Sequence, residues 1–384
     1  MNFASRWGLD PSVTYLNHGS FGACPTAVLD AQAALRREME REPVDFLSTH
    51  YQRRLDAARA ALAAFLSAAP EELVFVTNAT AGVNAVLRSL AFEPEDELLV
   101  TDHTYAACRK AIDFVAQSAR ARVVIAELAF PCLGEADVVA AVLERVSSRT
   151  RLALIDHVTS PTAMVLPVAK LILELQARGV DTLIDGAHAP GMVPVELSKL
   201  GATYYTGNAH KWMCAPKGAA FLYVQRDRQQ RLHPNVISHG YLAGFQAEFD
   251  WTGTFDPTPW LCIPESIRYM GSLLAGGWPA LMARNRTLAR RARTLVLGAL
   301  EMPAPCPESM IGSMFSLPLP LATGHPSGAR LDCDGLHSWF RERKLEAWFH
   351  PHPRPMLRLS AQLYNTFDQF EQYVRLLREA LQWQ

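Results

Sequence analysis

The chain has 384 residues, 49% of them hydrophobic and 20% charged, which is enough for a sizeable core and for about two or three domains. Its formal net charge of -1 gives no overall attraction to nucleic acid or to an anionic membrane. Because the N-terminus has no continuous apolar segment and no later run is long enough to span a bilayer, we expect a soluble, cytoplasmic protein with neither nucleic-acid nor membrane partners.

The first part of the chain combines helical and strand patterns. Residues 26–67 carry Ala, Leu, Arg and Glu at helical spacing, and Pro43 separates them into two predicted helices. Short apolar runs then alternate with helical stretches, at residues 73–76, 97–100, 121–128, 151–158, 180–185, 202–206 and 218–224. Strands that alternate with helices predict an α/β domain with a mostly parallel, seven-stranded sheet.

The pattern changes near residue 257. A long stretch rich in Ala, Leu, Met and Arg extends to about residue 300, and a segment rich in Pro and Gly follows at 303–329. We therefore predict a large domain over residues 1–256, which includes the N-terminal segment, and a smaller C-terminal α+β domain over 257–384.

Several familiar kinds of site have no signature in this sequence. The seven cysteines are widely scattered and form no CxxC pair, so we expect neither a disulfide framework nor a metal centre. The glycine-rich nucleotide-binding motifs and the GxSxG elbow do not occur either. The chemistry is therefore sought in the polar residues that follow the predicted strands, because ligands of parallel sheets bind there.

Two neighbouring predicted strands are followed by residues suited to Schiff-base chemistry. Asp185 closes the run 180–185, His188 lies three residues later, and Lys211 follows the next run in a chain with only six lysines. Pyridoxal 5'-phosphate (PLP) needs a lysine amine for a Schiff base and a carboxylate that keeps its ring nitrogen protonated. Taken alone, Asp185 and Lys211 fit equally well a helix N-cap and a solvated loop cation.

Ordered matches along nearly the whole chain decide between these interpretations. They resemble the class V aminotransferase family of fold-type I PLP enzymes and, within it, the group similar to isopenicillin N epimerase. The matching segments are YLNHGSFGACP (15–25), TNATAGVNAV (77–86), TDHTYAA (101–107), DHVTSPTAMVLPV (156–168), DGAHAPG (185–191), TGNAHKW (206–212), WTGTFDP (251–257) and LRLSAQLYN (357–365). The resemblance implies a fold-type I PLP-dependent transferase fold, a PLP cofactor, no metal, and a homodimer with shared active sites.

The resemblance also implies roles around the cofactor ring. Lys211 matches the lysine that forms the Schiff base, Asp185 the partner of the ring nitrogen, and His188 a contact near the phenolic oxygen. Ser160, with Thr159 as its rival, matches the group that hydrogen-bonds the phenolic oxygen. These residues come from three different predicted strand ends, as a ligand at the edge of a sheet requires.

A second set of matches surrounds the phosphate group. The turn at 78–82 enters a helical stretch, whose first N–H groups and dipole attract an anion. The matching phosphate contacts are Ala79, Thr80, Asn208 and His210. Thr254 matches a residue that reaches the phosphate of the neighbouring subunit, which is the reason to expect a homodimer.

A third set of matches faces the substrate. Arg358 matches the arginine that binds the substrate carboxylate through a bidentate fork, and Asn17, His18 and Gly19 match a loop that covers the substrate. His103 matches the ring that stacks on the cofactor, and Tyr105 competes for that place. The same two side chains are the candidates for a second acid or base.

The resemblance implies a PLP enzyme that acts at the α-carbon of an amino acid, with epimerisation or racemisation as the expected reaction. The alternatives are a carbon–sulfur lyase or cysteine desulfurase-like enzyme, and an aminotransferase. The stretch before Arg358 lacks the loop cysteine of desulfurases, and the nearest cysteine is Cys333. His350 and His352 in that stretch are expected to lie in an extended loop rather than at the substrate mouth. A regulator or inactive binding module is disfavoured because no basic arm is present.

Overall fold

A computed structural model describes residues 3–319, 332–351 and 354–381. Its centre is a seven-stranded sheet in which β8 pairs antiparallel with both β2 and β7, and every other neighbouring pair is parallel. In spatial order the strands are β2 (Leu73–Val76), β8 (Ala220–Val224), β7 (Tyr204–Asn208), β6 (Asp181–Asp185), β5 (Thr150–Asp156), β3 (Glu97–Thr101) and β4 (Arg122–Ala126). The predicted α/β class and mostly parallel seven-stranded sheet are confirmed, and every predicted strand is present.

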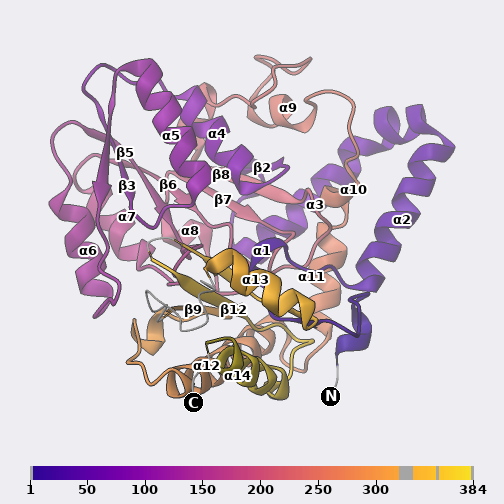
Figure 1. Ribbon diagram of the computed structural model, residues 1–384. Coiled ribbons are helices and arrows are strands. Elements are labelled where there is room, and N and C mark those ends of the chain that lie inside the picture. The colour runs from indigo at the N-terminus through magenta and orange to yellow at the C-terminus, as the bar shows by residue number, and fades with distance from the viewer. Residues whose placement is uncertain (1–2, 320–331, 352–353, 382–384) are drawn as a thin grey trace.

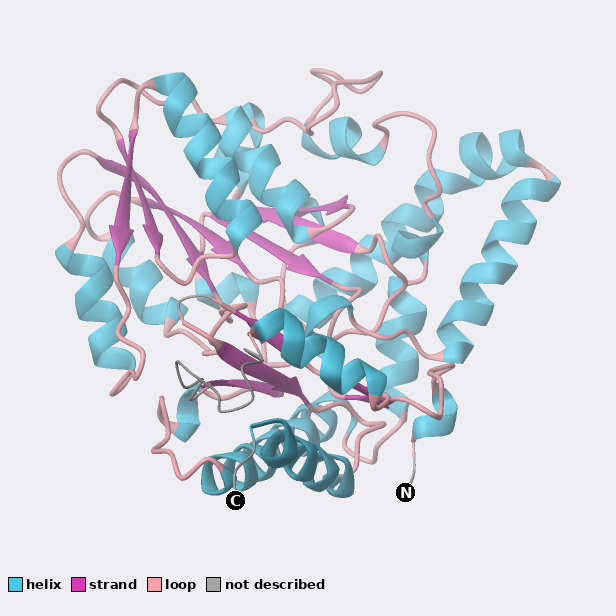
Figure 2. Cartoon of the chain, viewed as in Figure 1, coloured by secondary structure: helices cyan, strands magenta, loops and turns pink. Residues whose placement is uncertain are grey.

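Helices cover both faces of this sheet, as Figures 1 and 2 show. One face packs against α4 (Ala79–Ser89), α5 (Ala106–Ala119) and α9 (Phe245–Asp250). The other face packs against α3 (Tyr51–Leu66), α6 (Glu135–Glu144) and α7 (Val168–Gln176). Because the inner strands are covered on both sides, they are runs of apolar residues rather than alternating ones.

The C-terminal part contains a three-stranded antiparallel sheet, in which β12 pairs with both β11 and β9. Its strands are β9 (Met314–Pro318), β11 (Trp348–His350) and β12 (Met356–Ser360), and the helices near it are α12 (Gly277–Ala299), α13 (Cys333–Glu342) and α14 (Phe367–Leu381). Helices α12 and α14 lie together beyond this sheet, at the bottom of Figure 1. This part supplies Arg358, which stands on β12.

The N-terminal segment crosses to the C-terminal part. Strand β1 (Thr14–Tyr15) pairs with β10 (Leu345–Glu346), and the short helix α1 (His18–Phe21) follows it. The backbone N–H of Ser360 also donates to the carbonyl of Leu16. The chain therefore brings its residues 14–21 next to β12, where Arg358 is located.

The remaining elements complete the scaffold. The predicted pair of helices over 26–67 is α2 and α3, joined by a π-helical segment. The other elements are η1 (Ala4–Arg6), α2 (Thr26–Arg41), η2 (Asp45–His50), η3 (Pro70–Glu72), α8 (Leu197–Leu200), η4 (Arg226–Arg231), α10 (Thr258–Leu261), α11 (Ile263–Ser272) and η5 (Glu308–Met310). Among the described residues, no helix combines the length and the apolar character that crossing a membrane requires.

Candidate active site

A cavity of about 450 Å³ lies where the parallel strands end. Lys211 reaches it from the loop after β7, Asp185 from the end of β6, and Asp156 from the end of β5. The side chains around it are Ser20, Phe21, Asn78, Ala79, Thr80, Tyr105, Asp156, Val158, Ser160, Asp185, Ala187, His188, Asn208, His210 and Lys211. The cavity thus unites residues from six separate stretches of sequence at the edge where ligands of parallel sheets bind.

One end of the cavity is the N-terminus of α4. Asn78 caps this helix by accepting from the backbone N–H of Ala81 at 2.8 Å, and the Asn208 side-chain oxygen accepts from the backbone N–H of Ala79, also at 2.8 Å. Thr80 lies between these two capped positions and lines the cavity. The helix dipole and first-turn N–H groups suit an anion here, so this end fits a phosphate group.

His210 stands at the same end in a defined tautomer. Its Nδ1 lies 2.9 Å from the carbonyl oxygen of Ala219, which can only accept, so Nδ1 carries the proton. Burial lowers the pKa of His210 to about 4, so near neutral pH Nε2 holds a lone pair. A bound phosphate would favour a proton on Nε2, and His210 would then bind it as a cation.

Another part of the cavity wall, called the ring end below, is formed by a buried carboxylate. Asp185 accepts from the backbone N–H of Ala187 at 3.0 Å through Oδ1, and from the Cys108 thiol at 3.2 Å through Oδ2. Burial raises the pKa of Asp185, whereas these two hydrogen bonds and the charge of Lys211 oppose that rise. A carboxylate of this kind fits a protonated ring nitrogen, because an opposite charge favours its ionised form.

A second carboxyl group, which sequence reasoning missed, stands beside the first. Asp156 is the register partner of Asp185 on the adjacent parallel strand, and both line the cavity. Its Oδ2 is buried without a hydrogen-bond partner among the described residues. Burial and the neighbouring charge of Asp185 raise the pKa of Asp156, which favours its protonated form. The available signal was that Asp156, like Asp185, ends an apolar run.

Lys211 is the lysine that lines the cavity together with these two carboxyl groups. Its Nζ lies 3.1 Å from Nε2 of His188, which is also buried and lines the cavity. Burial, followed by the positive charge of Arg358, lowers the pKa of Lys211 to about 8. A larger share of Lys211 is therefore the free amine than for a solvated lysine. Lys217, in contrast, is an exposed residue whose amine donates to the carbonyl of Gly22.

The N-terminal loop contributes different residues from those expected. Ser20 and Phe21 line the cavity, whereas Asn17, His18 and Gly19 do not. His18 is fully buried, and its Nε2 donates to the backbone carbonyl of Lys211 at 3.1 Å. The backbone N–H of Gly19 donates to Ser360 at 3.0 Å. The turn of α1 therefore directs these three residues into the scaffold behind the cavity and only the next two toward the cavity.

Arg358 lies directly behind the cavity wall. Its Nη1 donates to the carbonyl and hydroxyl oxygens of Ser160 at 2.8 and 3.1 Å, and its Nη2 donates to the hydroxyl of Ser20 at 3.0 Å. The guanidinium group stacks 4.0 Å from the centre of the Trp348 ring. Burial lowers the pKa of Arg358 to about 9, while its Nε has no hydrogen-bond partner among the described residues. Arg358 is thus held by two residues that line the cavity.

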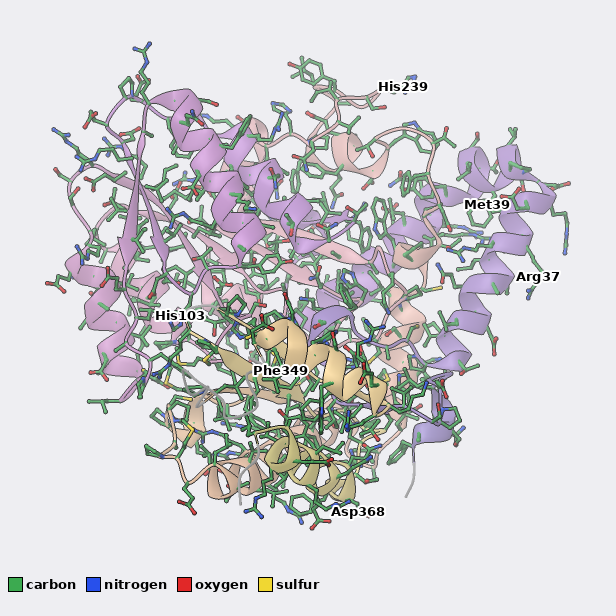
Figure 3. The ribbon with its side chains drawn as sticks, viewed as in Figure 1. Arg37, Met39, His103, His239, Phe349 and Asp368 are labelled. Atoms are coloured by element: carbon green, nitrogen blue, oxygen red, sulfur yellow. The ribbon has the colours of Figure 1, made fainter. Side chains whose placement is uncertain are left out.

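The structure places the two candidates for the stacking ring differently. Tyr105 lines the cavity with 43% of its surface exposed, whereas His103, labelled in Figure 3, is 1% exposed and does not line it. His103 Nδ1 is 3.0 Å from the hydroxyl of Thr162, and its ring meets the edge of Phe130. The geometry therefore favours Tyr105 over His103.

The remaining expectations concern Ser160 and its rival Thr159, Thr254, and the two histidines before Arg358. Of Ser160 and Thr159, only Ser160 lines the cavity, because Thr159 is buried against Thr162. Thr254 is exposed in the loop between α9 and α10 and does not line this cavity. His350 stands on β11, close to the carbonyl of Pro161, and His352 lies outside the described residues. No group of His, Cys, Asp and Glu in the described part of the chain could hold a metal ion.

Comparison with known proteins agrees with this site. The model of the class-V aminotransferase family matches residues 15–262. The chain is 34% identical to isopenicillin N epimerase of Streptomyces clavuligerus in an alignment that covers 95% of this chain and 94% of that enzyme. It is also 34% identical to putative L-cysteine desulfhydrase 1 of Oryza sativa subsp. japonica in an alignment that covers 82% of this chain and 69% of that protein.

The fold is shared with a solved structure at lower identity. Cysteine desulfurase from Thermococcus onnurineus NA1 matches with a TM-score of 0.81 over 96% of this chain and 95% of that one, at 19% identity. This match concerns the fold alone. Members of the class-V family and their structural neighbours bind PLP, which agrees with a cavity that offers a phosphate end, a lysine and a buried carboxylate.

Proposed function

The chain belongs to the class-V aminotransferase family of PLP-dependent enzymes, and on that premise we propose that it acts at the α-carbon of an amino acid, with epimerisation as the reaction that its site supports best. The observation that carries this proposal is that two acid–base groups, Lys211 and Tyr105, line one cavity. Lys211 follows β7 and Tyr105 follows β3, so they flank the two strands that end in Asp185 and Asp156. An epimerase needs such a pair, because the α-proton leaves on one side and returns on the other.

The residues that would hold the cofactor are divided between the two ends of the cavity. Asp185 would pair with the ring nitrogen, and Lys211 would hold the cofactor covalently. Thr80, Asn208 and His210 would bind the phosphate, assisted by the N-terminus of α4. Ser160 and His188 would contact the phenolic oxygen, and Tyr105 would face the ring. When bound, PLP supplies an electron sink for the pair released as the Cα–H bond breaks.

The remaining steps belong to side chains of the chain itself. Arg358 would exchange its hydrogen bonds to Ser20 and Ser160 for the substrate carboxylate, which orients the Cα–H bond. Lys211, whose pKa is lowered to about 8, would remove the α-proton as a free amine. Tyr105 would return a proton on the other side. Burial raises the pKa of Tyr105, which keeps its hydroxyl protonated and able to donate.

We infer from the same residues that the enzyme is a homodimer with shared active sites. Thr254 lies exposed in a loop outside its own cavity, where it is accessible to a second copy of the chain. In the dimer, Thr254 of each subunit would contact the phosphate in the other.

A second candidate is a lyase that releases a sulfur group from a cysteine-like substrate. It is favoured by the relatives named L-cysteine desulfhydrase, whose identity to this chain is similar to that of the epimerases. All seven cysteines of the chain are buried, and none of them lines the cavity. Sulfur would therefore leave directly as sulfide or thiol, and a protein persulfide of the desulfurase kind is disfavoured. Transamination remains a third reaction of the same site.

The experiment that separates these reactions uses D- and L-amino acids in heavy water. An epimerase incorporates deuterium at Cα, inverts the configuration and releases nothing, whereas a lyase releases sulfide and an aminotransferase forms a keto acid. The Tyr105→Phe variant should still exchange the α-proton but lose inversion by about 10²–10⁴-fold, the usual contribution of one acid–base group. His103→Gln is the matched control and should keep inversion. If His103→Gln alone lost inversion, the role given to Tyr105 would be wrong.

A further inference from the structure

Trp212 follows Lys211 directly, and its side chain contacts His188 rather than the cavity. We propose that Trp212 is a positioning residue: its indole N–H selects the tautomer of His188, so that the imidazole stays neutral and presents only an N–H donor to Lys211. The inference deepens the proposed function and rests on it, because it leaves Lys211 as the sole base on its side of the cavity. Trp212 touches no reacting atom and would act only through His188.

The hydrogen bonds around His188 define its protonation. Trp212 Nε1 donates to His188 Nδ1 at 3.4 Å. An indole nitrogen can only donate, so Nδ1 carries a lone pair and the proton of the neutral ring is on Nε2. That nitrogen lies 3.1 Å from Lys211 Nζ. In this tautomer the contact is an imidazole N–H that donates to the free-amine form of Lys211, because an ammonium group has no lone pair to accept it.

A protonated His188 is disfavoured from both sides of its ring. In an imidazolium both ring nitrogens carry a proton. The proton on Nδ1 would face the indole N–H of Trp212, and the proton on Nε2 would face Lys211. Burial also lowers the pKa of His188 well below its ordinary value, and the nearby cations lower it further. The titratable groups that act on it are Lys211, Arg358, His18 and His210.

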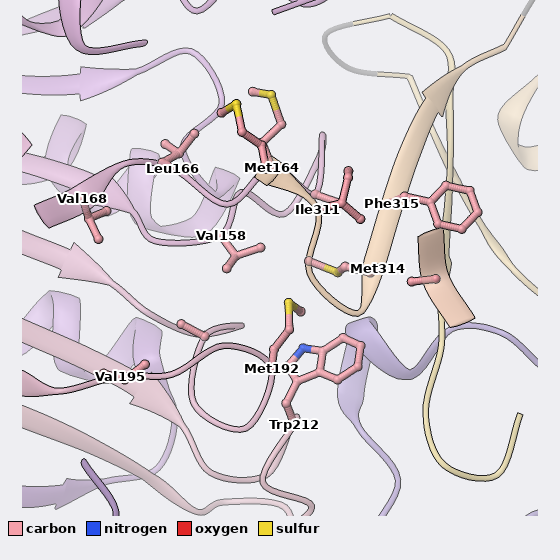
Figure 4. Packing of buried hydrophobic residues seen from close by; sticks show 14 of the residues in the cluster. Val158, Met164, Leu166, Val168, Met192, Val195, Trp212, Ile311, Met314 and Phe315 are labelled. Carbon is pink, nitrogen blue, oxygen red and sulfur yellow. The ribbon is translucent and has the colours of Figure 1, made fainter. Parts of the chain in front are cut away.

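The packing around Trp212 keeps its indole in this orientation. The side chain is fully buried and lies beside Met192, as Figure 4 shows. The His18 ring packs on it with centroids 4.8 Å apart. At the backbone of Trp212, a Cβ atom at Gly191 would come within 2.6 Å of the carbonyl group, so only glycine allows the loop that carries His188 to approach so closely. Burial of the side chain and its contact with the His18 ring favour the orientation in which the indole N–H faces His188.

A buried histidine in the cavity could either accept the α-proton or donate a hydrogen bond, and this arrangement leaves His188 only the second role. His188 cannot accept the α-proton, since neither of its nitrogens can take up a proton without facing another donor or cation. Once Lys211 is engaged, the Nε2–H becomes available to an acceptor in the cavity. Trp212 would thus make His188 a constant hydrogen-bond donor over the pH range in which histidine ordinarily titrates.

The direct test is the tautomer itself, measured by ¹⁵N NMR of histidine-labelled, PLP-loaded wild-type enzyme, with His188→Gln used to assign the signal. We expect His188 to be neutral and protonated on Nε2 throughout about pH 5 to 8. A signal protonated on Nδ1, or one that titrates in this range, would overturn the inference. The measurement needs no turnover, so a failure of the proposed reaction leaves it intact and is seen separately as an absence of α-proton exchange.

The variant Trp212→Phe keeps an aromatic ring but removes the indole N–H together with the five-membered ring that carries it, so a control with the same loss of volume is needed. Without the indole proton one obstacle to an imidazolium is gone and the pKa of His188 should rise, although burial and the nearby cations still oppose the rise. A full return to the ordinary ~6.5 sets the upper limit: about ten of eleven molecules would then be protonated at about pH 5.5, and kcat would fall about tenfold there. At pH 8 kcat should stay within about twofold of wild type and KM should not change, which a merely structural defect would not reproduce. The matched control is Trp260→Phe, which removes an equally buried indole whose N–H contacts only the carbonyls of Val76 and Gly218.

The double variant Trp212→Phe/His188→Gln completes the test. Glutamine cannot titrate, so the acidic fall in kcat seen with Trp212→Phe should disappear in the double variant. If the acidic fall persists without His188, Trp212 acts through another group and the inference is wrong. If Trp212→Phe does not fold, the wild-type tautomer still decides the question.

Discussion

The phosphate end and the ring end of the cavity differ in their exposure to solvent and in the elements that form them. The phosphate end uses the start of α4 and two residues near each other in sequence, Asn208 and His210, and part of it is open to solvent. The ring end places Asp156, Asp185 and Cys108 in a buried cluster from two strands and a helix. Burial shifts the pKa of His210 as well, but the two carboxyl groups of the ring end are buried beside each other, so their charge depends more strongly on their neighbours. The ring end should therefore be far more sensitive to single substitutions.

The largest effect is expected at Lys211, which serves both ends. Lys211→Ala removes the covalent link and the base, so turnover should fall by at least about 10⁴-fold, the upper value for one acid–base group. The two ends should still retain PLP without the covalent bond, as measured by dialysis and absorbance. Lys217→Ala is the control and should remain active. Borohydride reduction followed by peptide mapping must place the label on Lys211; a label on Lys217 or Lys199 would contradict the assignment.

The next effect tests the buried ring end directly. Asp185→Asn removes the carboxylate opposite the ring nitrogen, and breaking one side of a buried pair costs about 3–5 kcal/mol, or roughly 10²–10⁴-fold in kcat/KM. Asp156→Asn is the matched comparison on the adjacent strand. Because burial and Asp185 favour the protonated form of Asp156, a neutral amide should replace it with a much smaller loss. Equal losses in the two variants would show that Asp156 is ionised and that the two carboxyl groups share their role.

A pH effect of intermediate size is expected at the phosphate end. The folded pKa of His210 is lowered to about 4 from an ordinary 6.5, so the unfolded chain binds more protons between these values. The stability of the PLP-free protein should therefore fall as the pH decreases from about 6.5 to 4. Inorganic phosphate should reduce this fall, since it favours protonated His210.

The measurement for His210 is Tm against pH with and without phosphate, in wild type and His210→Gln. His18 and His157 are buried with lowered pKa values as well, so His210→Gln should lose only part of the pH dependence but all of the phosphate effect. A phosphate effect that survives in His210→Gln would transfer the role to the α4 N-terminus and Asn208.

The smallest effect is expected for Thr254, which would contact the phosphate in the partner subunit. Thr254→Ala removes one neutral hydroxyl from the partner's phosphate, and such a hydrogen bond contributes about 1 kcal/mol, so PLP affinity should weaken about fivefold. Dilution that separates the subunits should also release PLP. Thr252→Ala is the control on the same loop. A monomer with full activity and full PLP retention would rule out the shared site.

The sequence by itself determined the sheet and the general position of the site. Each inner strand is a continuous apolar run because both of its faces are covered, and the end of such a run is visible as the first polar residue. For that reason the pattern of residues alone assigns Asp185, His188 and Lys211 to one edge of the sheet. The turn at 78–82 is equally clear, since a helix N-terminus carries its donors within a few consecutive residues.

Only the tertiary structure decided which side chains face the cavity. His103 and Tyr105 are two residues apart on one loop. The path of that loop directs Tyr105 toward the cavity and buries His103 against Thr162. The position of His18 behind Lys211 depends on the pairing of β1 with β10, which joins residues some 330 positions apart. Long-range pairing and side-chain direction leave no local pattern in the sequence, so these parts of the site became visible only in the folded chain.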